Sequence, residues 1–440
     1  MNKTIPEKKI YCNREVKEEF TGKNLTRFGG TGLIRRYLKR IGISSYLEKI
    51  EVKKKRDRGY SPPEVFLSIL YGILLGLSRP YHMMELVRDK VFQKIAGLKG
   101  FPTQSTISRF FKGLSMRISR EIYHINYSLL MKVRKEFKDF TDGITADLDS
   151  HVTPVYGNQA RAKVGFNPKK KGRKSYHPIL CFIGETRDFL AGSLRSGKHH
   201  TSYNARIFLS SVIKALPVAI KRLRADSGFF SIEFIWWLKK KDIEFFIVVP
   251  LQQWAQRIIL HQGSWESIGR CIWAKEILLP LGKTVSCRLV IIRTKVGKGE
   301  KPKKELSLIK GDDAIYDYQM IATNSTKAPI EVWRFYNKRA NCENFIKESI
   351  YSFGLDNVVS QSWAGNNCWF QLVMLGYNIM NWFKEEVVLQ RDKKTFGEGI
   401  RRMLLLIPGK LIYTARQYIL KLEESWCYRK EYELALQRLE

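Results

Sequence analysis

The residues best suited to chemistry in this sequence are acidic side chains beside apolar segments of a strongly basic chain. Asp147 and Asp149 lie in the strand-like segment ADLDSHVTP and share one face, because side chains alternate along a strand. Asp226 ends a second strand-like segment, KRLRAD, and Glu343 lies in the helical segment FYNKRANCENFIKE. Carboxylates suit hard cations such as Mg²⁺ or Mn²⁺, and two such ions about 4 Å apart support phosphoryl transfer. The pattern predicts such a site, although each acid taken singly is also compatible with a solvated or ion-paired side chain.

The helical segment around Glu343 carries an unusual polar stripe. Tyr336, Arg339, Glu343 and Lys347 fall within about a quarter of the circumference of a helix with about 100° per residue. Flanking cations keep a metal-binding carboxylate ionised and can hold DNA phosphates, and Tyr336 could donate a hydrogen bond to a phosphate or orient the substrate strand. The alternative is ordinary ion pairing along an exposed helix, worth about 0.5 kcal/mol per pair.

The charge balance narrows the class of partner. The chain has 440 residues, and 77 Lys and Arg face 42 Asp and Glu, which gives a net charge of +35. Such an excess opposes compaction, so a polyanionic partner is expected, and double-stranded DNA is the leading candidate. A membrane surface or simple solubility is the alternative. The longest apolar run, VFLSILYGILLGLS, is too short to span a bilayer, which requires about 20 residues.

Several motifs that do not occur in the sequence bear on the cellular compartment and on the cofactors. The seven cysteines are scattered and never form a CxxC pair, which favours a reducing cytosol over a disulfide scaffold. The N-terminal segment MNKTIPEKKIYCNREVKEEF has no apolar signal sequence. No P-loop pattern occurs, so ATP is not expected as a cofactor. The cysteine pattern and the lack of a signal sequence predict a cytosolic protein.

The N-terminal part, residues 1–140, is expected to be a helical DNA-binding domain. TGLIRRYLKRIGISSYLEKI has helical periodicity, and the prolines of SPPEVFLSILYGILLGL suit a helix start. In QKIAGLKGFPTQSTISRFF one helix ends near the glycines and another begins after the proline. This spacing of helix ends is typical of a helix-turn-helix, in which Gln104, Ser105 and Arg109 would face a DNA groove. An ordinary corner between two helices has the same spacing.

The pattern changes to α/β from about residue 141. GITADLDSHVTPVYG, YHPILCFIG and DFLAGSLRSG are predicted strands, and strand–helix–strand alternation then predicts a mixed sheet with parallel members and flanking helices. Long helices are expected over 329–352 and 363–388. The predicted domains after the first are a catalytic core in two parts (141–250 and 326–390), a β-rich insertion (251–325) between the second and third acids, and a tail (391–440) of uncertain structure.

A basic loop follows the first pair of acids. Because it adjoins the predicted metal site, we expect its cations to contact the DNA backbone, a solvated charged loop being the alternative. These cations are Lys169, Lys170, Lys171, Arg173 and Lys174.

The order of the DLDS strand, RADSGF and the spacing YxxRxxxE resembles the DDE transposases of bacterial insertion sequences, in the group with a Tyr–Arg–Glu–Lys signature. The resemblance covers most of the chain, including TPVYGNQARAKVGFNPKKKGRKSYHP and SGKHHTSYNARIFL. It implies an RNase H-like fold on which Asp149, Asp226 and Glu343 bind the metals. The signature lysine would fall at position 350, which is Ile350 here, so Lys347 is expected to substitute for it.

Two of these assignments involve a choice between neighbouring acids. The first acid of the family directly precedes a small hydroxyl residue, which selects Asp149, followed by Ser150, over Asp147, although both could face the metals. Glu348 lies about 140° around the helix from Glu343 and off the polar stripe, so Glu343 is the expected third acid.

The resemblance therefore implies a cut-and-paste DNA transposase of the bacterial cytosol, associated with the nucleoid. It would cleave strands at terminal inverted repeats and transfer the 3′-OH ends into target DNA, with Mg²⁺ or Mn²⁺ as cofactor, two ions per active site, and a homodimer holding the paired ends. Two other classes remain open: a metal-dependent nuclease that cuts without joining, and an inactive DNA-binding protein with the same fold.

Overall fold

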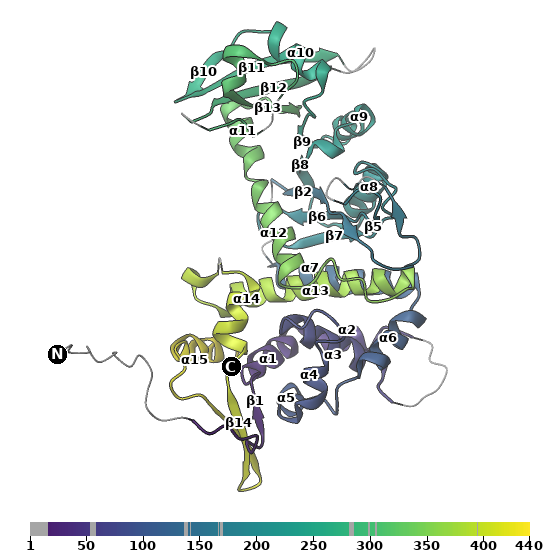
Figure 1. The fold of residues 1–440 in the computed structure, drawn as a ribbon, viewed down its shortest axis with the longest axis vertical. Helices are drawn as coiled ribbons and strands as arrows, with labels where there is room; N and C mark the ends of the chain where they lie inside the picture. The colour runs from purple at the N-terminus through teal and green to yellow at the C-terminus, as the bar shows by residue number, and fades with distance from the viewer. Residues whose placement is uncertain are drawn as a thin grey trace, which may run out of the picture.

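A computed structural model of the protein describes residues 16–52, 59–135, 140, 142–165, 167, 170–280, 286–297, 300–303, 306–393 and 395–440. Its largest element is a mixed sheet of nine strands (Figure 1). In spatial order the strands are β10 (Glu266–Gly269), β11 (Ile272–Pro280), β12 (Ser286–Lys295), β13 (Tyr316–Thr323), β9 (Glu244–Val248), β8 (Ile220–Ala225), β2 (Ile144–Ser150), β6 (Ile179–Ile183) and β7 (Phe189–Ser193).

The centre of this sheet is parallel and its flanks are antiparallel. β2 pairs with β8, and β8 with β9, in parallel, whereas β6, β7 and the strands from β13 outward pair antiparallel. Parallel strands need crossover helices, here α8 (Ala205–Ala215) and α9 (Ile232–Lys240). The prediction of a mixed α/β fold with flanking helices is confirmed.

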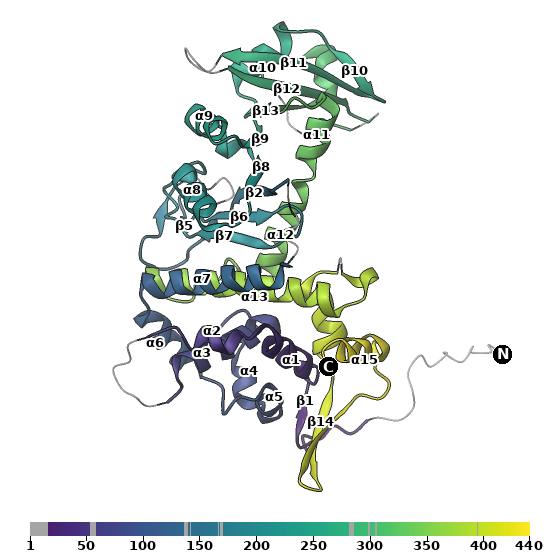
Figure 2. The same cartoon turned by 180° about the vertical axis from the view of Figure 1, so that it is seen from behind.

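The segment predicted as β-rich joins this sheet directly. It begins with a helix, α10 (Gln253–His261), and its strands β10 to β13 continue the sheet, because β13 pairs with β9 through Ile321 and Val248. Two further helices, α11 (Pro329–Asn337) and α12 (Ala340–Tyr351), then run along the sheet on the side away from α8 and α9 (Figures 1 and 2).

The prediction of a single helix over residues 329–352 is wrong in one respect. A turn at Lys338 and Arg339 divides this segment into α11 and α12. In a continuous α-helix the Arg339 N–H would donate to the Phe335 carbonyl. That carbonyl instead accepts from Arg224 Nη1 at 3.0 Å, and the Arg339 N–H donates to Tyr336 O at 2.8 Å. The Arg224 side chain of β8 thus takes the carbonyl that a continuous helix would use, and the backbone forms a tighter turn at Arg339.

A layer of helices lies at the end of the sheet formed by β7. Its central member is α13 (Trp363–Val387), which is buried along almost its entire length because the sheet lies on one side and N-terminal helices on the other (Figures 1 and 2). The other helices of the layer are α1 (Thr31–Ile41), α2 (Ile43–Leu47), α3 (Pro62–Leu74), α4 (Met84–Arg88), α5 (Lys90–Ala96), α6 (Gln104–Gly113) and α7 (Met116–Val133).

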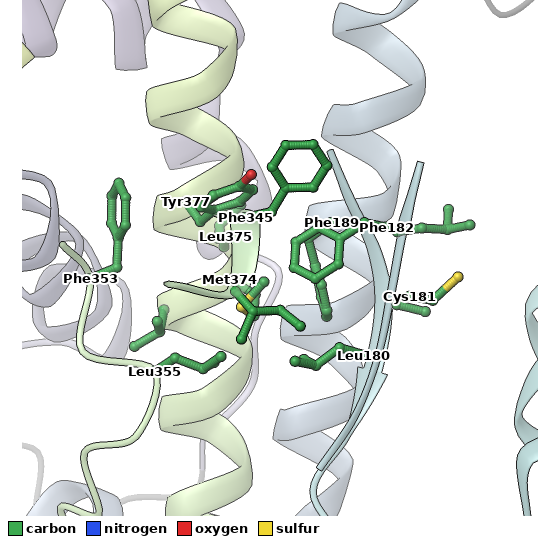
Figure 3. Close-up of a cluster of buried hydrophobic side chains, with 14 of the residues drawn as sticks. Leu180, Cys181, Phe182, Phe189, Phe345, Phe353, Leu355, Met374, Leu375 and Tyr377 are labelled. Atoms are coloured by element: carbon green, nitrogen blue, oxygen red, sulfur yellow. The ribbon is translucent and has the colours of Figure 1, made fainter. Parts of the chain in front are cut away.

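An aromatic cluster ties this layer to the sheet and to α12 (Figure 3). Phe182 of β6 lies 5.8 Å, between ring centroids, from both Phe345 of α12 and Tyr377 of α13. The Phe182–Tyr377 pair is edge-on, and aromatic contacts of this kind are worth about 1 kcal/mol beyond the apolar area they bury. The cluster fixes α12, which carries Glu343, against the strand that adjoins β2.

The C-terminal tail, whose structure could not be predicted, folds back onto the N-terminal part. β14 (Gly409–Thr414) pairs with β15 (Gln417–Leu422) on one edge and with β1 (Leu25–Thr26) on the other. The remaining elements are the small sheet β3 (Thr153–Pro154), β5 (Lys174–Tyr176) and β4 (Lys163–Val164), the helices α14 (Gly397–Ile400) and α15 (Arg429–Gln437), a π-turn (Arg401–Leu405), and 3-10 turns at Ser227–Phe229, Gly311–Ile315 and Gln390–Asp392. Within the described residues, none of the helices has the length and apolar character needed to cross a bilayer.

Candidate active site

The first two predicted acids lie side by side at the carboxyl edge of the parallel strands. Leu148 of β2 pairs with Ala225 of β8, so Asp149 and Asp226 occupy the next position on two neighbouring strands, which lie about 4.8 Å apart. Asp226 also caps the turn that follows it, its Oδ1 accepting from the Gly228 N–H at 3.1 Å. The carboxyl edge of parallel strands is where α/β folds commonly bind ligands.

The third predicted acid reaches this edge from α12 through an arginine. Arg339 Nη2 lies 2.8 Å from Asp149 Oδ2, and Arg339 Nη1 lies 3.9 Å from Glu343 Oε1. Arg339 Nη2 also donates to the carbonyl of Leu148 at 3.4 Å. The chain therefore brings Asp149, Asp226 and Glu343 to one place, with a buried guanidinium joining the first and the third.

Asp149 carries unfavourable electrostatics that a cation relieves. Burial is the main cause that raises its pKa, to about 6, and the charges of Asp226 and Glu343 also raise it. Arg339 and the N–H of Ser150 act in the opposite direction. For the guanidinium itself, burial is the largest single influence and disfavours the charge, but Asp149, Tyr336, Cys342 and Asp226 together outweigh it, so the pKa of Arg339 is raised. Each charge of this pair thus depends on the other.

The donor set fits a hard divalent ion in its chemistry, since all three groups are carboxylates. Within the described residues, however, no three Asp, Glu, His or Cys side chains are close enough together to enclose one ion. Arg339 lies between Asp149 and Glu343, so these carboxylates could converge on an ion only if the guanidinium moved.

Asp147 has a different environment from Asp149. It is fully buried, and its two oxygens accept from Arg224 Nε at 2.6 Å and Nη2 at 2.7 Å. Burial is the largest influence on the pKa of Asp147, which is raised although Arg224 opposes the shift. Because Arg224 also holds the carbonyl of Phe335, this pair joins β2, β8 and α11 beneath the site.

The other members of the polar stripe separate into buried and exposed groups. Tyr336 is buried, and burial chiefly raises its pKa to about 12, with Asp226 and Asp149 among its charged neighbours. Lys347 is exposed on α12. Glu348, the rival third acid, faces away and binds Lys384 Nζ at 3.2 Å and the Gly397 N–H at 2.7 Å. Glu348 therefore joins α12 to α13 and α14.

A histidine that the sequence patterns did not single out contacts Ser150, the residue after the first acid. His177 is buried, with Nε2 3.0 Å from Ser150 Oγ and Nδ1 2.9 Å from the carbonyl of His199. Ser150 Oγ also lies 3.3 Å from Thr201 Oγ1. Burial is the main cause that lowers the pKa of His177, which favours the neutral ring. A histidine that precedes a proline and a strand gives no periodic signal, so only its contacts reveal this role.

The predicted basic loop lies between β4 and β5, close along the chain to Asp149. Lys170, Lys171, Arg173 and Lys174 are exposed, whereas Lys169 lies outside the described residues. Two of them approach Tyr156: Lys170 Nζ donates to its hydroxyl, and the Arg173 guanidinium lies 4.7 Å from its ring centroid.

The predicted helix-turn-helix has the expected local geometry. α5 ends at Gly97, which has φ 72° in the left-handed region, and Thr103 caps α6 by accepting from the Thr106 N–H. Gln104, Ser105 and Arg109 are exposed on α6. Their contact with DNA stays a prediction.

The sequence of the chain is similar to that of a known protein family. The sequence profile of the family described as "Transposase DDE domain group 1" matches residues 8–264 and 300–440, which is most of the chain. The chain belongs to this family. It is therefore an enzyme of the DDE transposase class, which cleaves and transfers DNA with the help of divalent metal ions.

No curated protein sequence matches this transposase. Among solved structures, the piggyBac transposase synaptic complex with hairpin DNA is similar with a TM-score of 0.45 and 10% sequence identity, over 86% of this chain and 78% of that chain.

Proposed function

We propose that this transposase works by a cut-and-paste route, cleaving at terminal inverted repeats and joining the 3′-OH ends to target DNA. Asp149, Asp226 and Glu343 are the proposed metal ligands, for two Mg²⁺ or Mn²⁺ ions. The observation that carries the proposal is the adjacency of Asp149 and Asp226 at the carboxyl edge of β2 and β8, with Glu343 joined to Asp149 through Arg339.

The residues of the site are proposed to have different roles in phosphoryl transfer. When bound, the metal ions would activate the attacking oxygen and stabilise the leaving one. Asp149 and Asp226 are held by neighbouring strands, so their separation is set by the sheet. Arg339 neutralises Asp149 in the free protein, and its guanidinium is also suited to a DNA phosphate, which it can bind through two parallel hydrogen bonds. Tyr336 and Lys347 are proposed to position the substrate strand.

The wider organisation follows the same proposal. The sheet from β2 to β9, with α12, would be an RNase H-like core, and residues 251–325 an insertion whose strands extend it. Residues 1–140 and the basic loop would bind double-stranded DNA, and two copies would hold paired ends in the bacterial cytosol. The exposed positions of Lys171, Arg173 and Arg109 support contact with the DNA backbone.

The test uses terminal-repeat DNA taken from the flanks of the gene, Mg²⁺ and a target plasmid. Wild-type protein should give strand-transfer products, and Asp226→Asn should lose cleavage while retaining DNA binding. Asp312→Asn is the matched control, because it makes the same chemical change at an exposed turn. Cleavage without joining would indicate a nuclease, and binding alone an inactive DNA-binding protein. Undiminished cutting by Asp226→Asn would reject the assigned site.

A further inference from the structure

The C-terminal hairpin of β14 and β15 extends from the helical layer at the end of the molecule away from the large sheet (Figures 1 and 2). β1 pairs with the base of the hairpin, at Gly409 and Lys410. Farther out, the described residues form a two-stranded ribbon that closes in a turn at Ala415 and Arg416, both with positive φ. A ribbon of two strands is marginally stable by itself in water, so contacts to its faces matter for its stability.

A groove of about 530 Å³ lies between this ribbon and α5. One wall is formed by the ribbon and the other by α5 and the turn that follows it. The walls approach each other where Lys94 Nζ lies 3.6 Å from the ring centroid of Tyr418. The lining residues are Asn24, Lys90, Val91, Gln93, Lys94, Gly97, Leu98, Lys99, Leu411, Ile412, Tyr413 and Tyr418.

The two walls are held in place by contacts at the start of α5. Asp89 Oδ1 caps this helix by accepting from the Phe92 N–H at 2.7 Å, and Asp89 Oδ2 accepts from Thr26 Oγ1 of β1 at 2.5 Å. Since β1 pairs with β14, one carboxylate connects α5 to the sheet that carries the ribbon. The groove is therefore a fixed feature of the surface, made by segments from opposite ends of the sequence.

The groove is positively charged. Lys90, Lys94 and Lys99 line it and are all exposed, and none of its described lining residues is acidic. Arg416 adds a fourth exposed cation at the turn of the ribbon. Cations grouped in this way attract a polyanion such as the phosphate backbone of a nucleic acid.

The ribbon also presents exposed aromatic rings. Tyr413 and Tyr418 pair across the two strands, with ring centroids 4.8 Å apart, and are 62% and 56% exposed. A tyrosine offers an apolar ring and a polar hydroxyl, which suits a surface of mixed character. The DNA backbone has this character, because apolar sugar faces alternate with phosphates. An acidic protein segment would complement the lysines too, but the chain belongs to a family that acts on DNA.

We propose that this groove and ribbon bind the backbone of duplex DNA, at a site separate from the three acids. Lys90, Lys94 and Lys99 contact phosphates of one strand, while the tyrosine rings pack against its sugars. The turn at Arg416 enters the adjoining major groove, which is wide enough to admit a two-stranded β-ribbon. The proposal rests on the proposed function for its ligand, DNA, and adds to it a second binding surface that C-terminal residues help to form.

The test measures how the affinity for duplex DNA depends on salt, with fluorescence anisotropy in EDTA so that no strand is cut. Each phosphate contact contributes about 0.9 to the slope of log affinity against log salt, for a duplex of about 40 base pairs as for longer DNA. The triple variant Lys90→Gln/Lys94→Gln/Lys99→Gln should therefore lower the slope by about 2 to 3. At about 100 mM salt it should bind at least about tenfold more weakly than wild type.

A matched triple variant separates the groove from general electrostatics. Lys214→Gln/Lys240→Gln/Lys241→Gln removes the same number of exposed charges at the ends of α8 and α9. Lys240 Nζ lies 3.7 Å from the ring centroid of Trp236, much as Lys94 lies over Tyr418. This control should therefore suffer the same local losses but retain the slope of wild type.

A second pair of variants tests the turn of the ribbon. Arg416 has φ 62°, and Arg187, in the turn between β6 and β7, has φ 65°; both are exposed. Arg416→Gln should lower the slope by about 1, whereas Arg187→Gln should leave it unchanged.

An unchanged slope in the groove variant, or equal reductions in the groove and control variants, would overturn the proposal. An unchanged slope in Arg416→Gln would overturn the placement of the ribbon in the DNA. The outcome is separable from that of the proposed function. A protein that cleaves and joins DNA, with a slope that the groove variant does not alter, refutes the second surface alone. A protein whose slope falls as expected but that never cleaves, under any divalent ion, refutes the catalytic assignment alone.

Discussion

Replacing Arg339 by Gln should expose how far the first acid depends on its guanidinium. Arg339 and Asp149 are 5% and 8% exposed, and their charged atoms lie 2.8 Å apart. Removing one member of a buried pair leaves the other charge uncompensated, at a cost of about 3–5 kcal/mol. Unfolding entropy of about 2.1 cal/mol/K per residue gives about 0.9 kcal/mol/K for 440 residues. If the chain unfolds as one unit, a loss of about 3 kcal/mol lowers Tm by about 3 °C.

The assay is a thermal double-mutant cycle with and without Mn²⁺. The variant Arg339→Gln/Asp149→Asn has no stranded charge, so it should lose less stability than the sum of the single losses, with a coupling of about 2 kcal/mol or more. Mn²⁺ should raise the Tm of Arg339→Gln more than that of wild type, because an ion can replace the missing positive charge. Calorimetric titration with Mn²⁺ should show tighter binding in the same variant.

Two results would refute this reasoning. Additive losses in the double variant would mean that the two side chains are not energetically coupled. Equal Mn²⁺ effects on wild type and Arg339→Gln would mean that the guanidinium does not compete with a cation for Asp149. Either result would leave the strand register of Asp149 and Asp226 unaffected, so the cleavage test of Asp226→Asn stands independently.

Four further outcomes are expected. Lys384→Met leaves the carboxylate of Glu348 buried without its cation, so it should lower the free energy of unfolding by about 3–5 kcal/mol in chemical denaturation. An unchanged free energy of unfolding would mean that the Lys384–Glu348 pair does not contribute to stability. Ser61→Ala removes the capping box of α3 and should cost about 1 kcal/mol, and an unchanged denaturation midpoint would contradict that role. DNA affinity measured by fluorescence anisotropy should fall by about a thousandfold or more between about 50 and 200 mM salt. Lys171→Gln together with Arg173→Gln should lower the log–log slope by about 2, and an unaltered slope would remove these side chains from the DNA interface.

Much of the fold could be predicted because its signals are local. The strand segment at Asp149 alternates and is rich in apolar residues, KRLRAD leads into a Ser–Gly turn, and prolines mark the start of α3. The break before α12 was not predictable, because it arises when Arg224, more than 100 residues away along the chain, takes the carbonyl of Phe335. The pairing of β1 with β14 was not predictable either, because it joins segments from opposite ends of the sequence.

The candidate site shows the same division. Residue type and spacing made Asp147, Asp149, Asp226 and Glu343 candidates, and the resemblance to a known family favoured Asp149 as the first acid. Neither could distinguish the environments of Asp147 and Asp149. Both lie on one face of β2, yet Asp147 meets Arg224 from the paired strand and Asp149 meets Arg339 from a helix. His177 was missed because its contacts, to Ser150 and to the carbonyl of His199, come from residues with no pattern in common with it.

The sequence by itself determined which side chains could bind metal and DNA, because residue type, alternation and net charge are properties of the chain alone. Tertiary structure decided which of them meet, since strand order, the partner of each buried charge and the groove between α5 and the C-terminal hairpin all depend on segments distant in sequence. The free energy of a buried carboxylate depends on what surrounds it within a few ångströms. In this transposase those surroundings are assembled from β2, β8 and α12, which lie as much as about 200 residues apart in the chain.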